Sequence, residues 1–444
     1  METVALDRYI DLLEDIEPLR VYGKVVEITG IIVKATGLKV SIGEACRIYS
    51  DNDKVVNAEV VGFKDERVLL MAIDDIQGIR PGSKVLPVGR NLNIMVSEGL
   101  VGRVVDAVGN PIDGKGPVYG EPYAIAGARM NPLERQRITE PINLGVRAIN
   151  GLLTCGKGQR MGIFAGTGVG KSVLLGMMAR YTGAQVNVIG LIGERSREVR
   201  EFIERDLGED GLSKSVVVVC TAQEPPLAKV QAAYTTTALS EYFRDRGNDV
   251  LLMMDSLTRV SMAQREVGLA IGEPPTTKGY TPSVFTLLPR LLERVGTSAG
   301  TGSITGLYTV LVEGDDLTDP VADAAMSVLD GHIILTRELA MQGQYPAIDV
   351  LKSVSRLMLD IVDEDHKDKA MKFIEVLSTY KKYEDMINIG AYKEGTNMDI
   401  DRAIAMIDRL RHYMRQDIND NRDMADSVQG LYMLFDDDRQ VPGN

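Results

Sequence analysis

The chain has 444 residues, of which 44% are hydrophobic and 25% charged, and its formal net charge is −13. This length suffices for two or three domains, and we expect no membrane span because no apolar run reaches about 18 residues. The acidic N-terminus is unlike a secretory signal, and the negative charge argues against a surface built mainly for nucleic acid or anionic lipid.

Two patterns follow each other in the first 90 residues. Residues 1–18 carry apolar side chains at helical spacing, which predicts an amphipathic helix. The spacing leaves open whether this helix packs on its own domain or docks another protein. Over residues 19–90, short β-branched runs broken by Gly, Asp and Asn predict a small β-barrel. Examples of these runs are 24–29, 31–34, 54–63 and 68–73.

A Gly- and Pro-rich connection at 102–117 leads into the central domain, which we place at 91–357 together with this lead-in segment. Its strands are predicted from near-continuous apolar runs at 162–164, 186–192, 216–220, 250–254, 304–312 and 332–335. Such runs are typical of a parallel α/β sheet covered on both faces, whose ligands bind at the carboxyl ends of the strands. After about residue 357 only helical periodicity remains, which predicts a C-terminal helical domain at 358–444.

The most informative stretch is AGTGVGKS at 165–172, which lies between an apolar run and a helical pattern. Strand, glycine-rich loop, Lys-Ser and helix together indicate a phosphate-binding P-loop. Lys171 should reach the outer phosphates, and the Ser172 hydroxyl should bind Mg²⁺. Ala165 replaces the first glycine of the strict pattern, and its small side chain should leave the loop intact. The predicted nucleotide-binding residues of the loop are Gly166, Thr167, Gly168, Val169, Gly170, Lys171, Ser172 and Val173.

Two carboxylates follow predicted strands of the same sheet. The strand at 250–254 ends in Asp255, the Walker B arrangement in which a carboxylate holds Mg²⁺ through water. Glu194 follows the strand at 186–192, where a carboxylate can polarise an attacking water. The same spacing also fits an exposed glutamate that begins the next helix, at 196–207, and both interpretations stay open.

Two further residues of the central domain have a functional and a structural interpretation. Arg356 follows the last core strand, where it could stabilise transition-state charge from a subunit boundary or form a surface ion pair. Tyr345 could stack on an adenine or fill the core. The sequence alone does not decide between these alternatives.

Several long motifs together resemble one family. They are AVGNPIDGKGP (107–117), GVRAINGLLTCGKGQRMGIFAGTGVGKS (145–172), GLIGERSREVREF (190–202), LLMMDSLTRVSMAQREVGLAIGEPP (251–275), VLVEGDDLTDPVAD (310–323), LDGHIILTREL (329–339) and YPAIDVLKSVSR (345–356). The chain is similar to the catalytic ATPases of the rotary and type III export group, and it looks most like the flagellum-specific type III export ATPases.

The resemblance implies a RecA-like P-loop core with a parallel sheet, an N-terminal β-barrel and a C-terminal helical domain. It also implies roles for individual residues. Lys171 and Ser172 match the phosphate lysine and the magnesium hydroxyl, Glu194 the catalytic carboxylate, Arg195 the arginine just after it, Asp255 the Walker B acid, Arg356 the arginine finger inserted into a neighbour's site, and Tyr345 the adenine-side aromatic.

The function implied by the resemblance is hydrolysis of ATP with Mg²⁺ by a homohexameric ring that energises flagellar protein export. The implied partners are a stator-like regulator on the helix at 1–18, a central coiled-coil stalk protein, the export gate and export chaperone–substrate complexes. The expected location is the cytoplasm, peripheral at the cytoplasmic face of the inner membrane through these partners. Three widely spaced cysteines without a CxxC pattern fit reduced thiols in that compartment.

Other functions share parts of the pattern. ATPases of injectisomes, the virulence type III systems, carry nearly all the core motifs. The segments at 224–226 and 241–245 look closer to the rotary catalytic subunit, whereas the C-terminal helices lack that subunit's acidic stretch. A ring ATPase that translocates RNA is disfavoured by the negative charge and by the lack of an aromatic-basic stretch. Non-catalytic nucleotide-binding subunits usually lack the carboxylate that is present here as Glu194.

Overall fold

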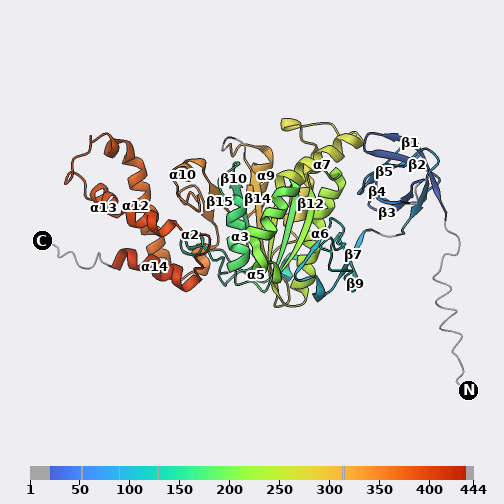
Figure 1. Cartoon of the computed structure of the whole chain (residues 1–444). Helices are drawn as coiled ribbons and strands as arrows, with labels where there is room; N and C mark the ends of the chain where they lie inside the picture. Colours follow the sequence, from blue (N-terminus) through green and yellow to red (C-terminus); the bar gives the residue numbers. More distant parts are fainter. Residues whose placement is uncertain are drawn as a thin grey trace, which may run out of the picture. The chain divides into compact units, whose positions relative to one another are not determined.

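The computed structural model describes residues 21–51, 54–89, 91–127, 130–312, 314 and 316–436. The helix predicted at 1–18 lies outside this range. The chain divides into two compact units (Figure 1). One contains the chain up to Leu92 together with Ala270–Gly272, and the other contains Asn93–Leu269 and the chain from Glu273 onward.

The first unit is a closed barrel with the strand order β1-β2-β5-β4-β3-β6. Alternate residues of each strand point inward, and Val33, Ile48 and Leu70 are among those with no exposed surface. The strands are β1 (Gly23–Thr29), β2 (Ile32–Thr36), β3 (Ala45–Tyr49), β4 (Val55–Lys64), β5 (Arg67–Ala72) and β6 (Lys84–Pro87). The predicted barrel is confirmed.

The second unit is built on an eight-stranded sheet with the order β16-β15-β10-β14-β13-β11-β12-β8. Every neighbouring pair is parallel except β15 and β16. The strands are β8 (Arg103–Val105), β10 (Arg160–Ala165), β11 (Val186–Glu194), β12 (Ser215–Thr221), β13 (Asp249–Asp255), β14 (Ser303–Leu311), β15 (Gly331–Leu335) and β16 (Val354–Ser355). The predicted parallel core is confirmed, and β8 shows that the 102–117 connection also supplies a strand.

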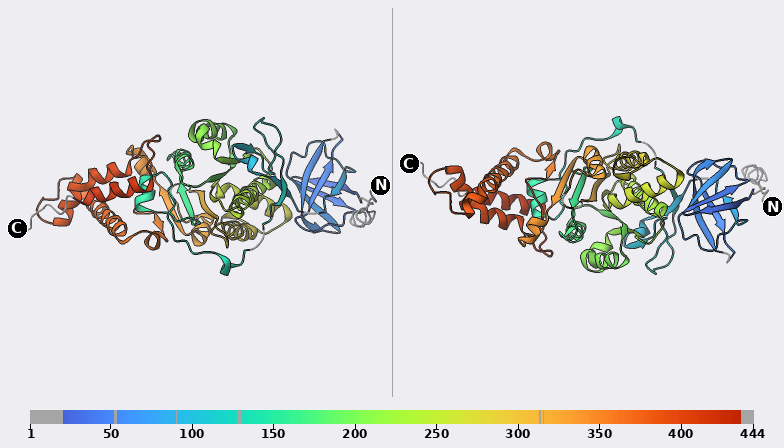
Figure 2. Two further views of the ribbon diagram at one scale, coloured as in Figure 1. Left: turned by 90° about the horizontal axis from the view of Figure 1, so that it is seen from below. Right: turned by 90° about the horizontal axis from the view of Figure 1, so that it is seen from above.

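Helices cover both faces of this sheet (Figure 2). Leu175 and Met178 of α3 (Lys171–Tyr181) belong to the same core cluster as Ile189 of β11. On the opposite face, α6 (Pro226–Asp245) approaches β11 so closely that a Cβ on Gly190 would lie 2.6 Å from Thr236 Oγ1. Glycine at position 190 therefore allows the close packing of α6.

Three helices follow the sheet: α12 (Glu364–Asn388), α13 (Met398–Met414) and α14 (Met424–Asp436). They pack on α2 (Arg147–Leu152), which lies beside them in Figure 1. His366 Nε2 lies 2.8 Å from the Gly151 carbonyl, and the Gln416 amide donates to the Gly145 carbonyl (2.8 Å). The predicted C-terminal helices are confirmed, and they share one hydrophobic core with the sheet.

The helix predicted at 196–207 is divided, because α4 (Ser196–Glu201) continues as a wider π-helical turn, η3 (Phe202–Leu207). The remaining elements are β7 (Asn93–Val96), β9 (Glu121–Ala124), η1 (Glu98–Leu100), η2 (Pro132–Glu134), η4 (Thr277–Gly279), α5 (Gly208–Ser213), α7 (Leu257–Ile271), α8 (Pro282–Leu292), α9 (Pro320–Val328), α10 (Arg337–Met341) and α11 (Met358–Ile361). Among the described residues, no helix combines the length and apolarity needed to cross a bilayer.

Candidate active site

The P-loop joins the carboxyl end of β10 to the N-terminus of α3. Gly168 and Gly170 have φ of +79° and +87°, a backbone region that favours glycine. Gly170 is the N-cap of α3 and makes no side-chain cap bond, so the first-turn N–H groups can face an anion. Ala165 has an ordinary strand conformation and pairs with Leu311 and Leu335, which explains why alanine is tolerated there.

Lys171 lies at the centre of a buried charged cluster. Its ammonium contacts both carboxylate oxygens of Asp255 and lies 4.0 Å from Glu194 Oε1. The hydroxyl of Thr309 donates to Asp255 Oδ1 (2.6 Å). The Asp255 side chain is only 4% exposed. Because β14, β13 and β11 are adjacent and parallel, their carboxyl ends bring these side chains to the same edge of the sheet as the P-loop.

Glu194 is held in a partly buried position next to these charges. Burial and the negative charge of Asp255 raise the pKa of Glu194 to about 7, while Lys171 opposes this shift. A carboxyl group with this pKa can accept a proton near neutral pH. Of the two interpretations of the sequence, this geometry favours a role in proton transfer over an exposed helix-starting glutamate.

The predicted magnesium ligands have the chemistry that Mg²⁺ prefers in proteins. Ser172 supplies a hydroxyl in the first turn of α3, and Asp255 supplies a carboxylate at the end of β13. The Lys171 ammonium joins α3 to Asp255, so the hydroxyl-bearing turn and the carboxylate lie at one site. These residues fit a magnesium ion shared with phosphate oxygens.

Arg195 is not part of the cluster around Lys171. Its side chain is 82% exposed and pairs with Glu198 on its own helix, at 3.6 Å. A different arginine, on α7, contacts Gly193. A Cβ on Gly193 would lie 2.8 Å from the Cβ of Arg259, so this arginine packs against the residue that precedes Glu194. Arg259 was not predicted from the sequence, although it lies in the 251–275 motif, four residues after Asp255.

Tyr345 lies beside the P-loop. A Cβ on Gly170 would be 3.5 Å from the Tyr345 ring. Tyr345 is also 48% exposed to solvent. Its carbonyl accepts a hydrogen bond from the Gln416 N–H (2.9 Å). Tyr345 is therefore not a core-filling residue, and its position suits contact with a bound planar group.

Arg356 lies near the amino ends of the parallel strands, whereas the P-loop lies at their carboxyl ends. It follows β16, which pairs with the beginning of β15 at Gly331, whereas the P-loop follows β10 at the level of Leu335. Four strand residues separate these levels by roughly 13 Å. The exposed Arg356 guanidinium contacts the Met326 carbonyl at 3.4 Å. Arg356 thus belongs to a different surface from the Lys171 cluster of its own chain.

Comparisons with known proteins cover all three parts of the chain. Residues 25–89 match the ATP synthase alpha/beta family β-barrel domain, 145–355 match the nucleotide-binding domain of that family, and 362–432 match the T3SS EscN ATPase C-terminal domain. The chain is 52% identical over 428 residues to the flagellum-specific ATP synthase of Bacillus subtilis, with coverage of 96% of this chain and 98% of that protein.

The chain is also similar to two ATPases of type III secretion systems. The type 3 secretion system ATPase of Xanthomonas euvesicatoria is 48% identical over 420 residues, which cover 94% of this chain and 95% of that protein. The structure of the assembled ATPase EscN from the type III secretion system of enteropathogenic E. coli is similar with a TM-score of 0.88 at 42% identity. It covers 93% of this chain and 99% of EscN, and EscN has also been solved in complex with its central stalk EscO.

Proposed function

This chain belongs to the ATP synthase alpha/beta family and is an ATPase of its type III secretion branch, and we propose that it hydrolyses Mg-ATP in a homohexameric ring that energises flagellar protein export. The observation that carries the proposal is the convergence of Lys171, Asp255 and the raised-pKa Glu194 beside the P-loop. The near full-length similarity to flagellum-specific relatives supports the flagellar pathway.

The P-loop residues bind and orient the triphosphate. The N–H groups of the loop and of the first turn of α3 hold the phosphate oxygens, and Lys171 moves from the Asp255 carboxylate to the outer phosphates. Ser172 and Asp255 would hold Mg²⁺, which when bound neutralises charge on the phosphates. Tyr345 offers its exposed ring to the adenine.

Glu194 and an arginine carry the chemical step. Glu194 accepts a proton from the water that attacks the γ-phosphorus, and the bond to the ADP oxygen breaks. Arg356 cannot reach the site of its own chain from the amino ends of the parallel strands. We therefore assign it to the γ-phosphate held by the neighbouring subunit, where it stabilises transition-state charge.

The proposed partners follow from the same family. The ring would bind a central coiled-coil stalk protein, and EscN has been solved in complex with its central stalk EscO. The segment 1–18 would bind a stator-like regulator, and the ring would receive export chaperone–substrate complexes at the export gate. In this proposal the protein is cytoplasmic and is held at the inner face of the membrane by its partners.

Phosphate release is the direct test of the activity. The purified full-length chain, concentrated and supplied with ATP and Mg²⁺, should release inorganic phosphate, and chelation of the metal should stop it. Absence of phosphate release at any concentration would reject the proposal. Turnover that depends on added RNA would favour an RNA-translocating ring.

A genetic test separates flagellar from injectisome export, which remains the second candidate because the C-terminal domain matches an injectisome ATPase. Deletion of the gene should abolish swimming and flagellin secretion, and the wild-type gene should restore both. Complementation with the E194Q variant should fail. A deletion strain that swims normally but secretes no virulence effectors would assign the chain to an injectisome.

A further inference from the structure

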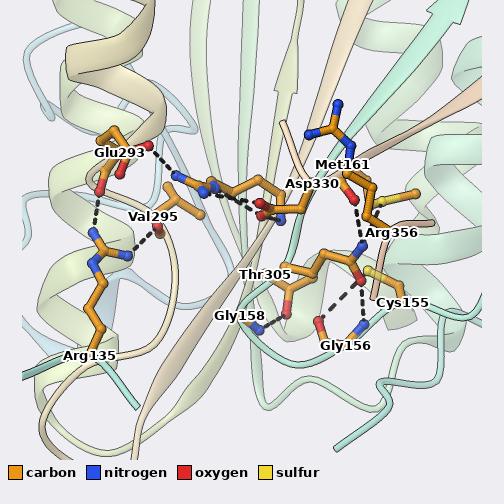
Figure 3. Close-up of polar contacts among 12 residues, drawn as sticks. Arg135, Cys155, Gly156, Gly158, Met161, Glu293, Val295, Thr305, Asp330 and Arg356 are labelled. Carbon is orange, nitrogen blue, oxygen red and sulfur yellow. Dashed lines mark hydrogen bonds and ion pairs between the residues drawn. The ribbon is translucent and has the colours of Figure 1, made fainter. Parts of the chain in front are cut away.

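The amino end of β10 carries a tightly bonded pair, Arg160 and Asp330. The Arg160 guanidinium donates Nε–H to Oδ2 (3.0 Å) and Nη2–H to Oδ1 (3.1 Å) of Asp330. The Arg160 backbone N–H also donates to Oδ2 (3.0 Å), and the Asp330 N–H donates back to the Arg160 carbonyl (2.8 Å). Four bonds therefore fix the start of β10 to the residue that precedes β15 (Figure 3).

Asp330 is the main partner of the largely buried Arg160, and Glu293 is a more exposed second contact. The Arg160 side chain is 16% exposed, and the Glu293 carboxylate lies 2.8 Å from its Nη1. Burial disfavours the charge on Arg160, but the bonds and charges of Asp330 and Glu293 outweigh this effect and raise its pKa. A bidentate arginine–carboxylate pair in this setting has one defined geometry, unlike an exposed ion pair.

Asp330 passes this geometry to Arg356. The Asp330 carbonyl accepts the N–H of Arg356 (3.0 Å) and the amide of Gln159 (3.2 Å). Gln159, which is fully buried, also donates to Ser355 Oγ (3.1 Å). The Ser355 hydroxyl is thus bonded to Gln159 and the Arg356 backbone N–H to Asp330, while the Arg356 guanidinium remains exposed with one long contact.

We propose that the Arg160–Asp330 pair is a positioning device that sets where the Arg356 side chain leaves the surface and enters the neighbouring subunit's site. This inference rests on the proposed role of Arg356 as the arginine of that site. A misplacement of about 1 Å at a reacting group can cost on the order of 100-fold in rate, so a tether of this kind has a kinetic consequence.

The alternative is that the Arg160–Asp330 pair only stabilises the sheet. A double-mutant comparison distinguishes this purely structural role from the positioning of Arg356. The substitution R160K keeps the charge but cannot form the bidentate fork. The four proteins to compare are the wild type, R160K, R356A and R160K/R356A. E293Q is the matched control, because Glu293 contacts the same guanidinium but not Asp330 or Arg356.

We expect R160K to lower kcat about 10-fold with KM for ATP unchanged within about twofold, because only the transition-state contact is displaced. In the R356A background the same substitution should cause no further loss, because the residue that it positions is gone. E293Q should keep kcat within about twofold of the wild type. Sedimentation and thermal unfolding report whether each ring is assembled and folded.

Two results would overturn the inference: an equal loss of kcat from R160K in both backgrounds, or an unchanged kcat in assembled R160K. If R160K does not assemble, D330N takes its place in the same comparison, because its main-chain carbonyl can still accept from Arg356. If R356A alone turned over ATP at the wild-type rate, the proposed role of Arg356 itself would be rejected, and not only the positioning role of Arg160 and Asp330.

Discussion

Glu194 is the residue whose environment most directly predicts its chemistry. Replacing it with glutamine keeps its size but removes the group that accepts a proton. We expect E194Q to lower turnover by at least ~100-fold while ATP binding, measured by equilibrium titration, changes little. Near wild-type steady-state hydrolysis by this variant would exclude Glu194 as the base.

The pKa of Glu194, about 7, predicts a pH dependence. The ionised carboxylate is the active form, so kcat/KM should rise as the pH rises through about 7 and level off above it. Glu198 is one of the groups that raise this pKa. E198Q should therefore move the rising limb to lower pH, and a limb that stays in place would show that another group titrates.

At the level of residues, local motifs located much of the site. The P-loop and Asp255 are recognisable because each follows or ends a continuous apolar strand and has a characteristic local sequence. Thr309, which donates to Asp255, was missed because it lies on β14 and meets Asp255 only through strand pairing. Arg259 was missed because its closeness to Gly193 depends on how α7 packs beside the end of β11.

At the level of elements, the close contact between β11 and α6 can be tested by substitution. G190A would place a Cβ against Thr236 and should destabilise the protein by about 1–3 kcal/mol, measured by denaturant unfolding. The double variant G190A/T236A should recover part of this loss, because the nearest atoms are removed. A G190A protein as stable as the wild type would contradict the close approach of α6 to the sheet.

The core strands could be predicted because they are buried on both faces and read as continuous apolar runs. The strands β7, β8, β9 and β16 were not predicted, because their two to four residues are too few for a recognisable period. The π-helical turn η3 was also hidden, because the apolar spacing over 196–207 is compatible with an ordinary helix. Fold class was therefore predictable, and individual boundaries were not.

At the scale of the whole molecule, the structure separates Arg356 from the Lys171 cluster of the same chain. If Arg356 completes a neighbour's site, R356A should lower turnover on the order of 10³-fold without changing the unfolding midpoint. Activity assays on assembled rings, paired with thermal unfolding, check both parts. A large fall in the midpoint would indicate a structural role instead.

The sequence of one chain does not specify whether an arginine acts in the nucleotide site of its own subunit or in that of a neighbouring subunit. The family resemblance implied a finger for Arg356, and the spacing alone also fitted a surface ion pair. The topology favours the finger in a neighbour's site. Antiparallel β16 returns the chain to the amino ends of the parallel strands, away from the P-loop of the same chain.

Mixing two inactive variants tests the shared site most directly. E194Q retains Arg356, and R356A retains Glu194 and the P-loop, so rings assembled from both contain some interfaces with every group intact. We expect each variant alone to be nearly inactive, and an equal mixture, reassembled and supplied with Mg-ATP, to regain phosphate release from up to about a quarter of its sites. A mixture no more active than the sum of its two components would contradict the claim that ATP is cleaved between two subunits.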